Sequence, residues 1–353
     1  MKDGIEFFRQ HILQAELQHM PLQLRGGGTK DWYGETPHGT VLDTRIHCGI
    51  VDYDPTELVI TARCGTPLAE IEAALAEKNQ MLAFEPPYFA DGATIGGVVA
   101  SGLSGPRRAT AGAVRDFMLG AVLMDGAGEE LHFGGQVMKN VAGYDVSRLL
   151  AGSLGTLGLI LEVSIKVLPK PFAEHTLRLS MSQSEALMQL NRWGGQPLPI
   201  SASVWCDDKL TLRLSGARAA VAAAIEKIGG ETVDHAEAFW RDIREQNDAF
   251  FTRTHQALWR LSVPSTTPPI ALPGVQLIEW GGAQRWVQTD ADAVQVRTAA
   301  TAAGGHATLY VGNDRAVGVF HPLAPAVAAI HRRMKTSFDP SGIFNPGRLY
   351  PEF

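Results

Sequence analysis

The chain has 353 residues, of which 45% are apolar and 19% charged, and a formal net charge of -6. This composition excludes intrinsic disorder and a coiled coil, and the acidic balance argues against nucleic acid as a partner, since that binding relies on clustered Lys and Arg. The three cysteines, Cys48, Cys64 and Cys206, form no Cys-x-x-Cys pair, which excludes a disulfide framework and an iron–sulfur cluster held by this chain alone.

No segment of the sequence has the pattern of a membrane span. The longest uncharged stretch, residues 261–278, contains four prolines, which an isolated apolar helix would not tolerate. The N-terminus mixes charged and apolar residues at helical spacing, which predicts an amphipathic helix within residues 1–19 rather than a signal peptide. We therefore expect a cytoplasmic protein with no transmembrane segment, whose association with the inner face of the membrane, if any, comes through partners.

The elements predicted for the first half combine short strands with helices. Strands are predicted at residues 22–25, 40–43, 57–63, 117–124, 130–133 and 158–168. The turn Asp125-Gly126-Ala127-Gly128 joins the fourth and fifth strands in a hairpin. A helix is predicted from Thr66 as N-cap, through Pro67, to about Glu77. Pro169-Lys170-Pro171 ends the last strand and is the clearest domain boundary.

Beyond this boundary glycine becomes rarer, and longer helices alternate with strands. Helices are predicted at residues 184–193, 217–228, 235–250, 290–303 and 323–337. Strands are predicted at residues 201–205, 209–214, 257–263, 275–280 and 307–311. No internal repeat or low-complexity tract is visible.

Glycine is concentrated in the first half of the chain. Residues 1–169 hold 23 of the 37 glycines, and 15 of these fall between Gly92 and Gly158. Glycine accepts positive φ and lets the backbone approach other groups closely. The density fits a loop-rich sheet domain with many tight turns, or a long ligand held by main-chain groups. The motifs that follow favour the ligand.

The first motif places Gly26, Gly27 and Gly28 directly after a predicted strand and before Thr29 and Lys30. Successive glycines let backbone N–H groups converge into the concave nest that holds phosphate oxygens. The Gly-x-x-x-x-Gly-Lys spacing of a Walker A loop is missing. Taken alone, the motif fits a flexible turn equally well.

Two further glycine motifs follow. In residues 92–102, Thr94 can cap a short helix of small residues, whose first amides and dipole would reach a pyrophosphate closely. The same pattern also suits a helix packed tightly against a sheet. In residues 152–162 the glycines are three apart and lead into a strand, so the order and context of a Rossmann turn are both absent.

As an ordered set the motifs are more specific than any one of them. The order is RGGGTK at 25–30, TIGGVVASG at 94–102, KNVAGYD at 139–145, GSLGTLGLILE at 152–162 and FDPSGIFNPGR at 338–348. It closely resembles the PCMH-type FAD-binding fold of the vanillyl-alcohol oxidase family. Within that family, the length of the chain and the residues of its motifs are similar to those of the E subunits of bacterial glycolate oxidases (glycolate dehydrogenases). The resemblance is strong over residues 20–170, thinner over 173–330 and clear again at 338–349.

The resemblance implies an α+β fold with four parts. Residues 1–19 would form an N-terminal helix, and residues 20–170 a PCMH-type FAD-binding domain of two subdomains. Residues 171–335 would form a smaller α/β cap domain of the substrate-binding type. Residues 336–353 would return to the flavin site of the FAD domain.

Carried across position by position, the resemblance also implies a set of cofactor-binding residues. The pyrophosphate loop would comprise Arg25, Gly26, Gly27, Gly28, Thr29 and Lys30. The second wall would comprise Pro86, Gly92, Thr94, Ile95, Gly96 and Gly97, followed by Gly102, Gly112 and Val114 towards the flavin. Gly155 and Ile160 would hold the adenosine half, and Asn345 would approach the isoalloxazine ring. The family's Arg-Tyr before the glycine at position 112 is replaced here by Thr110-Ala111.

The resemblance implies non-covalent FAD, because covalent attachment in this family uses a His or Cys and the loop of residues 26–30 contains neither. Catalytic relatives carry a His-x-Gly-Asp-Gly-Asn-x-His stretch, of which residues 304–314 keep only His306. His306 is a candidate base, and Arg315 and Arg348 are candidate carboxylate ligands. Each also fits an ordinary structural or solvated role. We assign no catalytic residue and expect no metal site.

Three hypotheses follow from the resemblance. In the first, the chain is the FAD-carrying subunit of a complex that oxidises glycolate or D-lactate. A homologous flavin-containing subunit would then oxidise the small 2-hydroxy acid, and an iron–sulfur subunit would take the electrons. In the second, the chain is a self-sufficient flavin-dependent 2-hydroxy-acid dehydrogenase. In the third, it is a structural subunit whose FAD site is vestigial.

Overall fold

The computed structural model describes residues 2–135, 145–252, 256–312 and 314–353. The chain forms two compact units. The first contains the residues up to 103 together with 113–169 and 322–353, and the second contains 104–112 and 170–321. Most of the motif at residues 139–145 lies outside the described residues. The predicted domain boundaries remain predictions.

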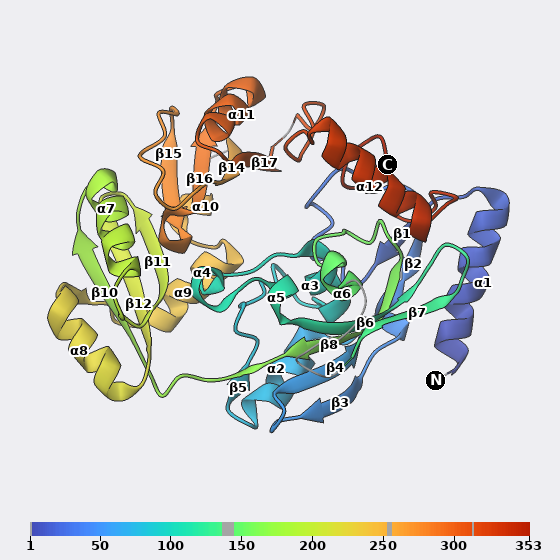
Figure 1. The fold of residues 1–353 in the computed structure, drawn as a ribbon, viewed down its shortest axis with the longest axis horizontal. Coiled ribbons are helices and arrows are strands. Elements are labelled where there is room, and N and C mark those ends of the chain that lie inside the picture. The colour runs from blue at the N-terminus through green and yellow to red at the C-terminus, as the bar shows by residue number, and fades with distance from the viewer. Residues whose placement is uncertain (1, 136–144, 253–255, 313) are drawn as a thin grey trace. The chain divides into compact units, whose positions relative to one another are not determined.

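The first unit is built on a five-stranded antiparallel sheet with the order β3-β4-β8-β6-β7 (Figure 1). These strands are β3 (Ile50–Asp54), β4 (Val59–Arg63), β6 (Met118–Met124), β7 (Glu130–Gly134) and β8 (Leu159–Lys166). Two smaller sheets pair β1 (Leu22–Arg25) with β2 (Thr40–Asp43) in parallel and β5 (Gln80–Met81) with β9 (Leu168–Pro169) in antiparallel. The helices are α1 (Lys2–Gln18), η1 (Thr44–Ile46), α2 (Leu68–Ala76), α3 (Ile95–Ser101), α5 (Val114–Phe117), α6 (Val146–Leu149) and α12 (Pro325–Phe338).

The two ends of the chain meet at β1. Helix α1 buries one apolar face, where Phe8 and Ile12 are fully enclosed and pack in the same cluster as Leu22. The N–H of Leu22 donates a 2.7 Å hydrogen bond to the carbonyl of Ile343, and the N–H of Asn345 donates a 2.9 Å hydrogen bond back to the carbonyl of Leu22. The C-terminal segment is therefore hydrogen-bonded to the first strand of the chain.

The second unit is an eight-stranded antiparallel sheet with the order β13-β10-β12-β11-β15-β16-β14-β17. These strands are β10 (Ala173–Ser180), β11 (Ile200–Cys206), β12 (Lys209–Gly216), β13 (Glu231–Thr232), β14 (Ala257–Ser262), β15 (Val275–Glu279), β16 (Gln284–Thr289) and β17 (His306–Val311). The helices are α4 (Arg108–Ala111), α7 (Gln183–Gly194), α8 (Arg218–Ile228), α9 (Ala236–Glu245), α10 (Ala249–Thr252), η2 (Trp280–Gly282) and α11 (Ala293–Ala302). Apolar clusters between helices and sheet form its core.

Strands β3, β10 and β16 are the longest elements absent from the sequence prediction. Strand β16 buries all six of its residues, although several are polar. The side chain of Gln284 bonds Glu279, and the Nε and Nη2 atoms of Arg285 donate to two main-chain carbonyls, so most of these polar atoms have partners inside the protein. The alternation of apolar and polar residues that marks a half-buried strand is therefore missing.

Two predicted helix boundaries are wrong. The helix predicted over residues 235–250 is interrupted at Gln246, whose φ of 58° places it in the left-handed region, so α9 and α10 are separate. Thr66 does not cap α2: its hydroxyl donates to the carbonyl of Arg63 at 2.7 Å and accepts from the N–H of Gly49 at 2.9 Å. The N-cap of α2 is Pro67. The predicted cap of α3 is confirmed, since Thr94 Oγ1 accepts a hydrogen bond from the N–H of Gly97 at 3.3 Å.

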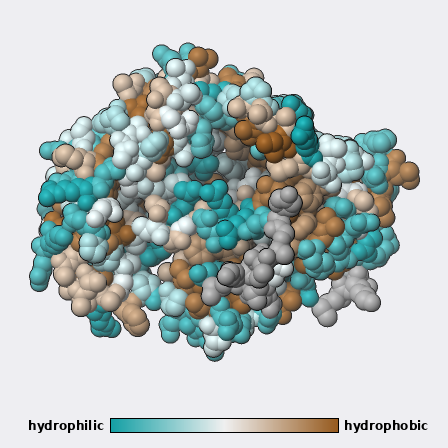
Figure 2. Space-filling model, viewed as in Figure 1, coloured by the Kyte–Doolittle hydropathy of each residue, from teal (hydrophilic) through white to brown (hydrophobic). Residues whose placement is uncertain are grey.

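Figure 2 shows hydrophilic and apolar side chains interspersed over the face that it displays. Within the first unit, Leu13, Leu17 and Met20 follow one another at intervals of one helical turn and are 42%, 82% and 39% exposed. Among the described residues, no helix is both long enough and apolar enough to cross a membrane.

Candidate cofactor-binding site

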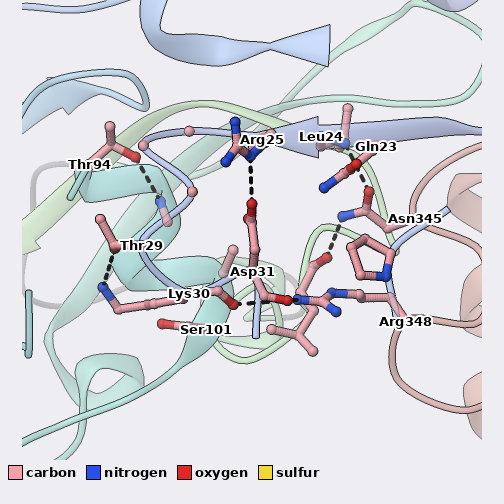
Figure 3. A pocket seen from close by; sticks show the side chains of 17 residues that line it. Gln23, Leu24, Arg25, Thr29, Lys30, Asp31, Thr94, Ser101, Asn345 and Arg348 are labelled. Carbon is pink, nitrogen blue, oxygen red and sulfur yellow. Dashed lines mark hydrogen bonds and ion pairs between the residues drawn. The ribbon is translucent and has the colours of Figure 1, made fainter. Parts of the chain in front are cut away.

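A solvent-open pocket in the first unit lies between the glycine loop, helix α3 and the C-terminal segment (Figure 3). It contains about 590 Å³ of empty space. Its lining comes from four distant stretches of sequence: residues 23–31 with Pro37, residues 94–101, Leu154, and the pair Asn345 and Arg348. The topology therefore gathers the motifs at residues 25–30, 94–102, 152–162 and 338–348 around one hollow.

The last two carbonyl groups of the glycine loop are occupied, and its amide groups are available. The carbonyl of Gly28 accepts from the N–H of Asp31 at 3.1 Å, and the carbonyl of Thr29 accepts from the indole of Trp32 at 3.1 Å. In the described part of the chain, no protein acceptor is within hydrogen-bonding distance of the N–H groups of Gly27, Gly28 and Thr29. Successive unpaired amides at a pocket wall are the donor set that binds a phosphate.

Close backbone packing explains the run of glycines. A Cβ at Gly27 would lie 1.7 Å from the carbonyl oxygen of Gly92, and a Cβ at Gly26 would lie 2.3 Å from Thr94 Oγ1. Gly28 has a φ of +73°, which L side chains rarely adopt. The loop thus packs directly on the segment that leads into α3, and larger residues would separate the two walls.

Gly97 is different, because the space beside it belongs to the pocket. It lines the pocket from the first turn of α3, and a Cβ there would meet only Thr94 Oγ1, at 3.3 Å. By contrast, a Cβ at Gly96 would lie 2.7 Å from the Cβ of Cys64 and would push α3 off the sheet. The helix therefore uses one glycine for packing and leaves the position of the other open for a ligand.

The pocket is locally positive in an acidic protein. Its charged lining residues are Arg25, Lys30, Asp31 and Arg348, three cations to one anion. Arg25 Nε and Asp31 Oδ2 form a 2.6 Å ion pair across the ends of the glycine loop. Lys30 Nζ lies 3.3 Å from the carbonyl oxygen of Tyr88. The charge balance favours an anionic ligand, which matches the free amides of the loop.

The C-terminal segment forms a rigid wall. Asn345 Nδ2 donates to the carbonyl of Leu154 at 2.6 Å, and Asn345 Oδ1 accepts from the N–H of Leu24 at 2.8 Å. Behind it, the buried Lys335 donates to Asp339 Oδ2 at 2.6 Å. Desolvation by burial lowers the pKa of Lys335, and the carboxylate of Asp339 opposes that shift.

A second hollow adjoins the first and shares Gly97, Leu154 and Asn345 with it. It is lined further by Thr44, Cys64, Gly96, Gly155, Gly158, Leu159 and Ile160. Its lining is more apolar than polar, which suits the flat base of a nucleotide rather than a phosphate. Burial raises the pKa of the Cys64 thiol to about 12, so this side chain is a neutral, unreactive part of the wall.

The predicted site residues fall into two groups. The two hollows are lined by Arg25, Gly26, Gly27, Gly28, Thr29, Lys30, Thr94, Gly96, Gly97, Gly155, Ile160 and Asn345. The others, which do not line them, are Pro86, Gly92, Ile95, Gly102, Gly112 and Val114. Gly92 supports Gly27, Gly102 packs on Gly152, and Ile95 and Val114 are buried. Gly112 ends α4 and belongs to the second unit.

The sequence does not predict that Asp31 and Ser101 line the pocket, nor the role of Arg348. Arg348 is 6% exposed and donates to main-chain carbonyls, so it is neither a solvated arginine nor an open carboxylate ligand. His306 opens β17 in the second unit. Desolvation, Arg260 and His321 lower the pKa of His306. In the portion of the chain that the structure describes, no group of three or more His, Cys, Asp or Glu side chains is placed to hold a metal ion.

The second unit has its own hollow, with about 1020 Å³ of empty space, beside α7, β11 and Trp280. Its polar lining is largely used within the protein. The N–H of Gly281 donates to Ser203 Oγ at 3.0 Å, and Asn191 Nδ2 donates to the carbonyl of Ser265 at 3.0 Å. Among the residues that the structure describes, no charged side chain lines it, so these residues select no ligand class.

Comparisons with known proteins bear on the family and the fold of the chain. Residues 9–134 match a family model described as an FAD binding domain. The chain is 50% identical to glycolate oxidase subunit GlcE of Escherichia coli (strain K12) over 343 residues, which are 97% of this chain and 96% of that protein. It is 32% identical to glycolate oxidase subunit GlcD of Bacillus subtilis (strain 168) over 172 residues, 48% of this chain and 36% of the relative.

A solved structure of alkyldihydroxyacetonephosphate synthase superposes with a TM-score of 0.65 at 16% identity, covering 96% of this chain and 74% of that one. At this identity the likeness concerns the fold. Together with the family model, it confirms the expected α+β architecture and the PCMH-type FAD-binding fold.

Proposed function

The chain belongs to the family of glycolate oxidase subunits represented by GlcE, and from this premise we propose that it carries FAD in a multi-subunit enzyme that oxidises glycolate or D-lactate to the corresponding oxo acid. When bound, FAD supplies a two-electron acceptor for the oxidation of a 2-hydroxy acid. What this chain contributes is the binding and shielding of that group.

The observation that carries the proposal is the unpaired amide set of Gly27, Gly28 and Thr29 in a pocket with a positive lining. A diphosphate bears two negative charges and needs several donors, and main-chain amides supply them without entering the formal charge count. This explains how a chain with a net charge of -6 can hold an anionic dinucleotide. The space beside Gly97 leaves room for the same group.

We assign the adjoining apolar hollow, with Gly155 and Ile160, to the adenosine half of the cofactor. The first pocket takes the diphosphate and opens towards Ser101 and Asn345. Binding is non-covalent, because the described residues that line the two hollows include neither a His nor a reactive Cys: the thiol of Cys64, which lines one of them, has a pKa of about 12. FAD should therefore leave the protein on acid or heat denaturation.

We place the substrate chemistry and the onward electron transfer on partner chains. A homologous flavin-containing subunit would bind the hydroxy acid, and an iron–sulfur subunit would take the electrons. All three cysteines are free thiols, as in a reducing compartment, which supports a cytoplasmic assembly. The exposed apolar row of Leu13, Leu17 and Met20 on α1 and just beyond it offers a surface that a permanent partner would cover.

The test compares the chain alone with the chain co-purified from native cells. We expect the isolated chain to bind FAD and to show flavin absorption that glycolate and D-lactate do not bleach. The co-purified assembly should be bleached by one of them and should show iron–sulfur absorption. Gly97→Val, expected to be colourless but folded, serves as the control.

Two outcomes would contradict the proposal. Bleaching of the lone chain by a hydroxy acid would make it a self-sufficient dehydrogenase. A wild-type chain that takes up no FAD on titration would make the site vestigial.

A further inference from the structure

If the glycine loop binds an anion through its amides, other groups must hold its carbonyl oxygens. A peptide loop that binds an anion with its N–H groups must have its carbonyl oxygens engaged elsewhere, since a carbonyl dipole facing the anion repels it. The carbonyls of Gly28 and Thr29 are engaged locally, by Asp31 and Trp32. The carbonyl of Lys30 accepts locally from the N–H of Tyr33 at 3.0 Å, and the carbonyls of Lys30, Asp31 and Glu35 also accept from a residue at the other end of the chain.

That residue is Arg348. Its Nη2 donates to the carbonyl of Asp31 at 2.8 Å and to the carbonyl of Lys30 at 3.4 Å, and its Nη1 donates to the carbonyl of Glu35. In return, the N–H of Glu35 donates to the carbonyl of Arg348 at 3.0 Å. The guanidinium is buried, and Figure 3 shows it beside the loop, on the same side of the pocket as Asn345.

We infer that Arg348 is a positioning residue for dinucleotide binding: it holds the carbonyls of Lys30, Asp31 and Glu35, so that the preceding amides stay available for the diphosphate. This inference rests on the proposed function and deepens it. The planar guanidinium can serve several carbonyls at once because its five N–H donors form a rigid fork, whereas a lysine ammonium offers the same charge without that geometry.

Positioning predicts a specific pattern of affinities. Arg348→Gln and Arg348→Lys should both raise the Kd for FAD by about 10- to 100-fold, the effect expected for losing hydrogen bonds of a charged donor. The Kd for ADP should rise by the same factor, because ADP presents the same diphosphate to the loop. Adenosine, which lacks the diphosphate, should bind the variants and the wild type equally.

The experiment titrates apoprotein with FAD, ADP and adenosine by calorimetry. Arg332→Gln, an exposed arginine on α12, is the matched control and should leave all three affinities unchanged. If Arg348→Lys keeps wild-type affinity for FAD and ADP, the positive charge matters and the positioning role is overturned. If FAD binding weakens while ADP binding does not, Arg348 acts on the flavin half and the inference is again overturned.

Hydrogen exchange on the wild type covers the case in which the Arg348 variants do not fold. Adding ADP should slow exchange at Gly27–Thr29 and also at the amides of Glu35 and Arg348, which are bonded to the C-terminal segment. Protection confined to Gly27–Thr29 would contradict a coupling between the glycine loop and the C-terminal segment. Failure of the wild type to bind either FAD or ADP would contradict the proposed function itself, whereas equal binding by wild type and variants contradicts the inference alone.

Discussion

Asn345 and Leu154 are 191 positions apart in sequence, yet the side-chain amide of Asn345 donates a 2.6 Å hydrogen bond to the carbonyl of Leu154. Its oxygen accepts from the N–H of Leu24, so one side chain ties together β1, the turn before β8 and the C-terminal segment. A Cβ at Gly155 would lie 2.7 Å from Asn345 Nδ2, which shows how tightly the turn is packed.

Asn345→Asp should therefore destabilise the first unit. A carboxylate accepts but cannot donate, so the Leu154 carbonyl would lose its partner and face a negative charge, at a cost of about 2–3 kcal/mol. Urea unfolding followed by far-UV circular dichroism measures this. An unchanged midpoint would mean that the three segments are held by other contacts.

Substituting Gly97 should weaken FAD binding without destabilising the fold. Gly97→Ala adds a methyl group towards the pocket, 3.3 Å from Thr94 Oγ1, while alanine favours the helix by about 1 kcal/mol over glycine. We expect the apoprotein to keep or slightly raise its melting temperature while FAD binds at least tenfold more weakly, a loss of about 1.4 kcal/mol. Gly194→Ala, a helical glycine with open space in the second unit, is the control and should not alter FAD binding.

The buried pair Lys335 and Asp339 should be strongly coupled. Lys335 Nζ also donates to the carbonyls of Thr156 and Phe344, and Asp339 is 1% exposed. Lys335→Met leaves a buried carboxylate without its cation, and we expect a loss of about 3–5 kcal/mol. Adding Asp339→Asn should lower the free energy of unfolding little further, so the double variant should have a denaturation midpoint close to that of Lys335→Met. Strictly additive losses in chemical denaturation would argue against a coupled pair.

His47 should make stability depend on pH below neutrality. The ring is 5% exposed, and burial, followed by the charge of Arg63, lowers its pKa from 6.5 to about 4. Between pH 6.5 and pH 4, His47 is therefore protonated in the unfolded chain and mostly neutral in the folded chain. This part of the stability is complete above pH 6.5 and falls by about 3 kcal/mol as the pH drops to 4.

The measurement is the free energy of unfolding of wild type and His47→Leu at several pH values between 7 and 4. The variant lacks the titrating group, so the free energy of unfolding of the wild type, relative to that of the variant, should fall by about 3 kcal/mol between pH 7 and pH 4. Curves that stay parallel would show that His47 is protonated equally in both states.

The site was predictable from sequence where the backbone itself imposes the residue. Gly27 and Gly28 are needed for close approach and positive φ, and the cap of α3 by Thr94 is a local pattern, so both could be read in order along the chain. Arg348 could not, because its partners are carbonyl groups whose positions depend on the fold of residues 30–35. Strand β16 was hidden for a related reason: its buried polar side chains find partners on other elements.

The placement of the C-terminal segment beside β1 sets the order of events during biosynthesis. Asn345 and Arg348 are the last of the pocket's lining residues to leave the ribosome, while the glycine loop is among the first. A nascent chain therefore carries an incomplete wall throughout translation. Loading with the dinucleotide becomes a final maturation step. Chains truncated before Asn345 should therefore be isolated without bound flavin.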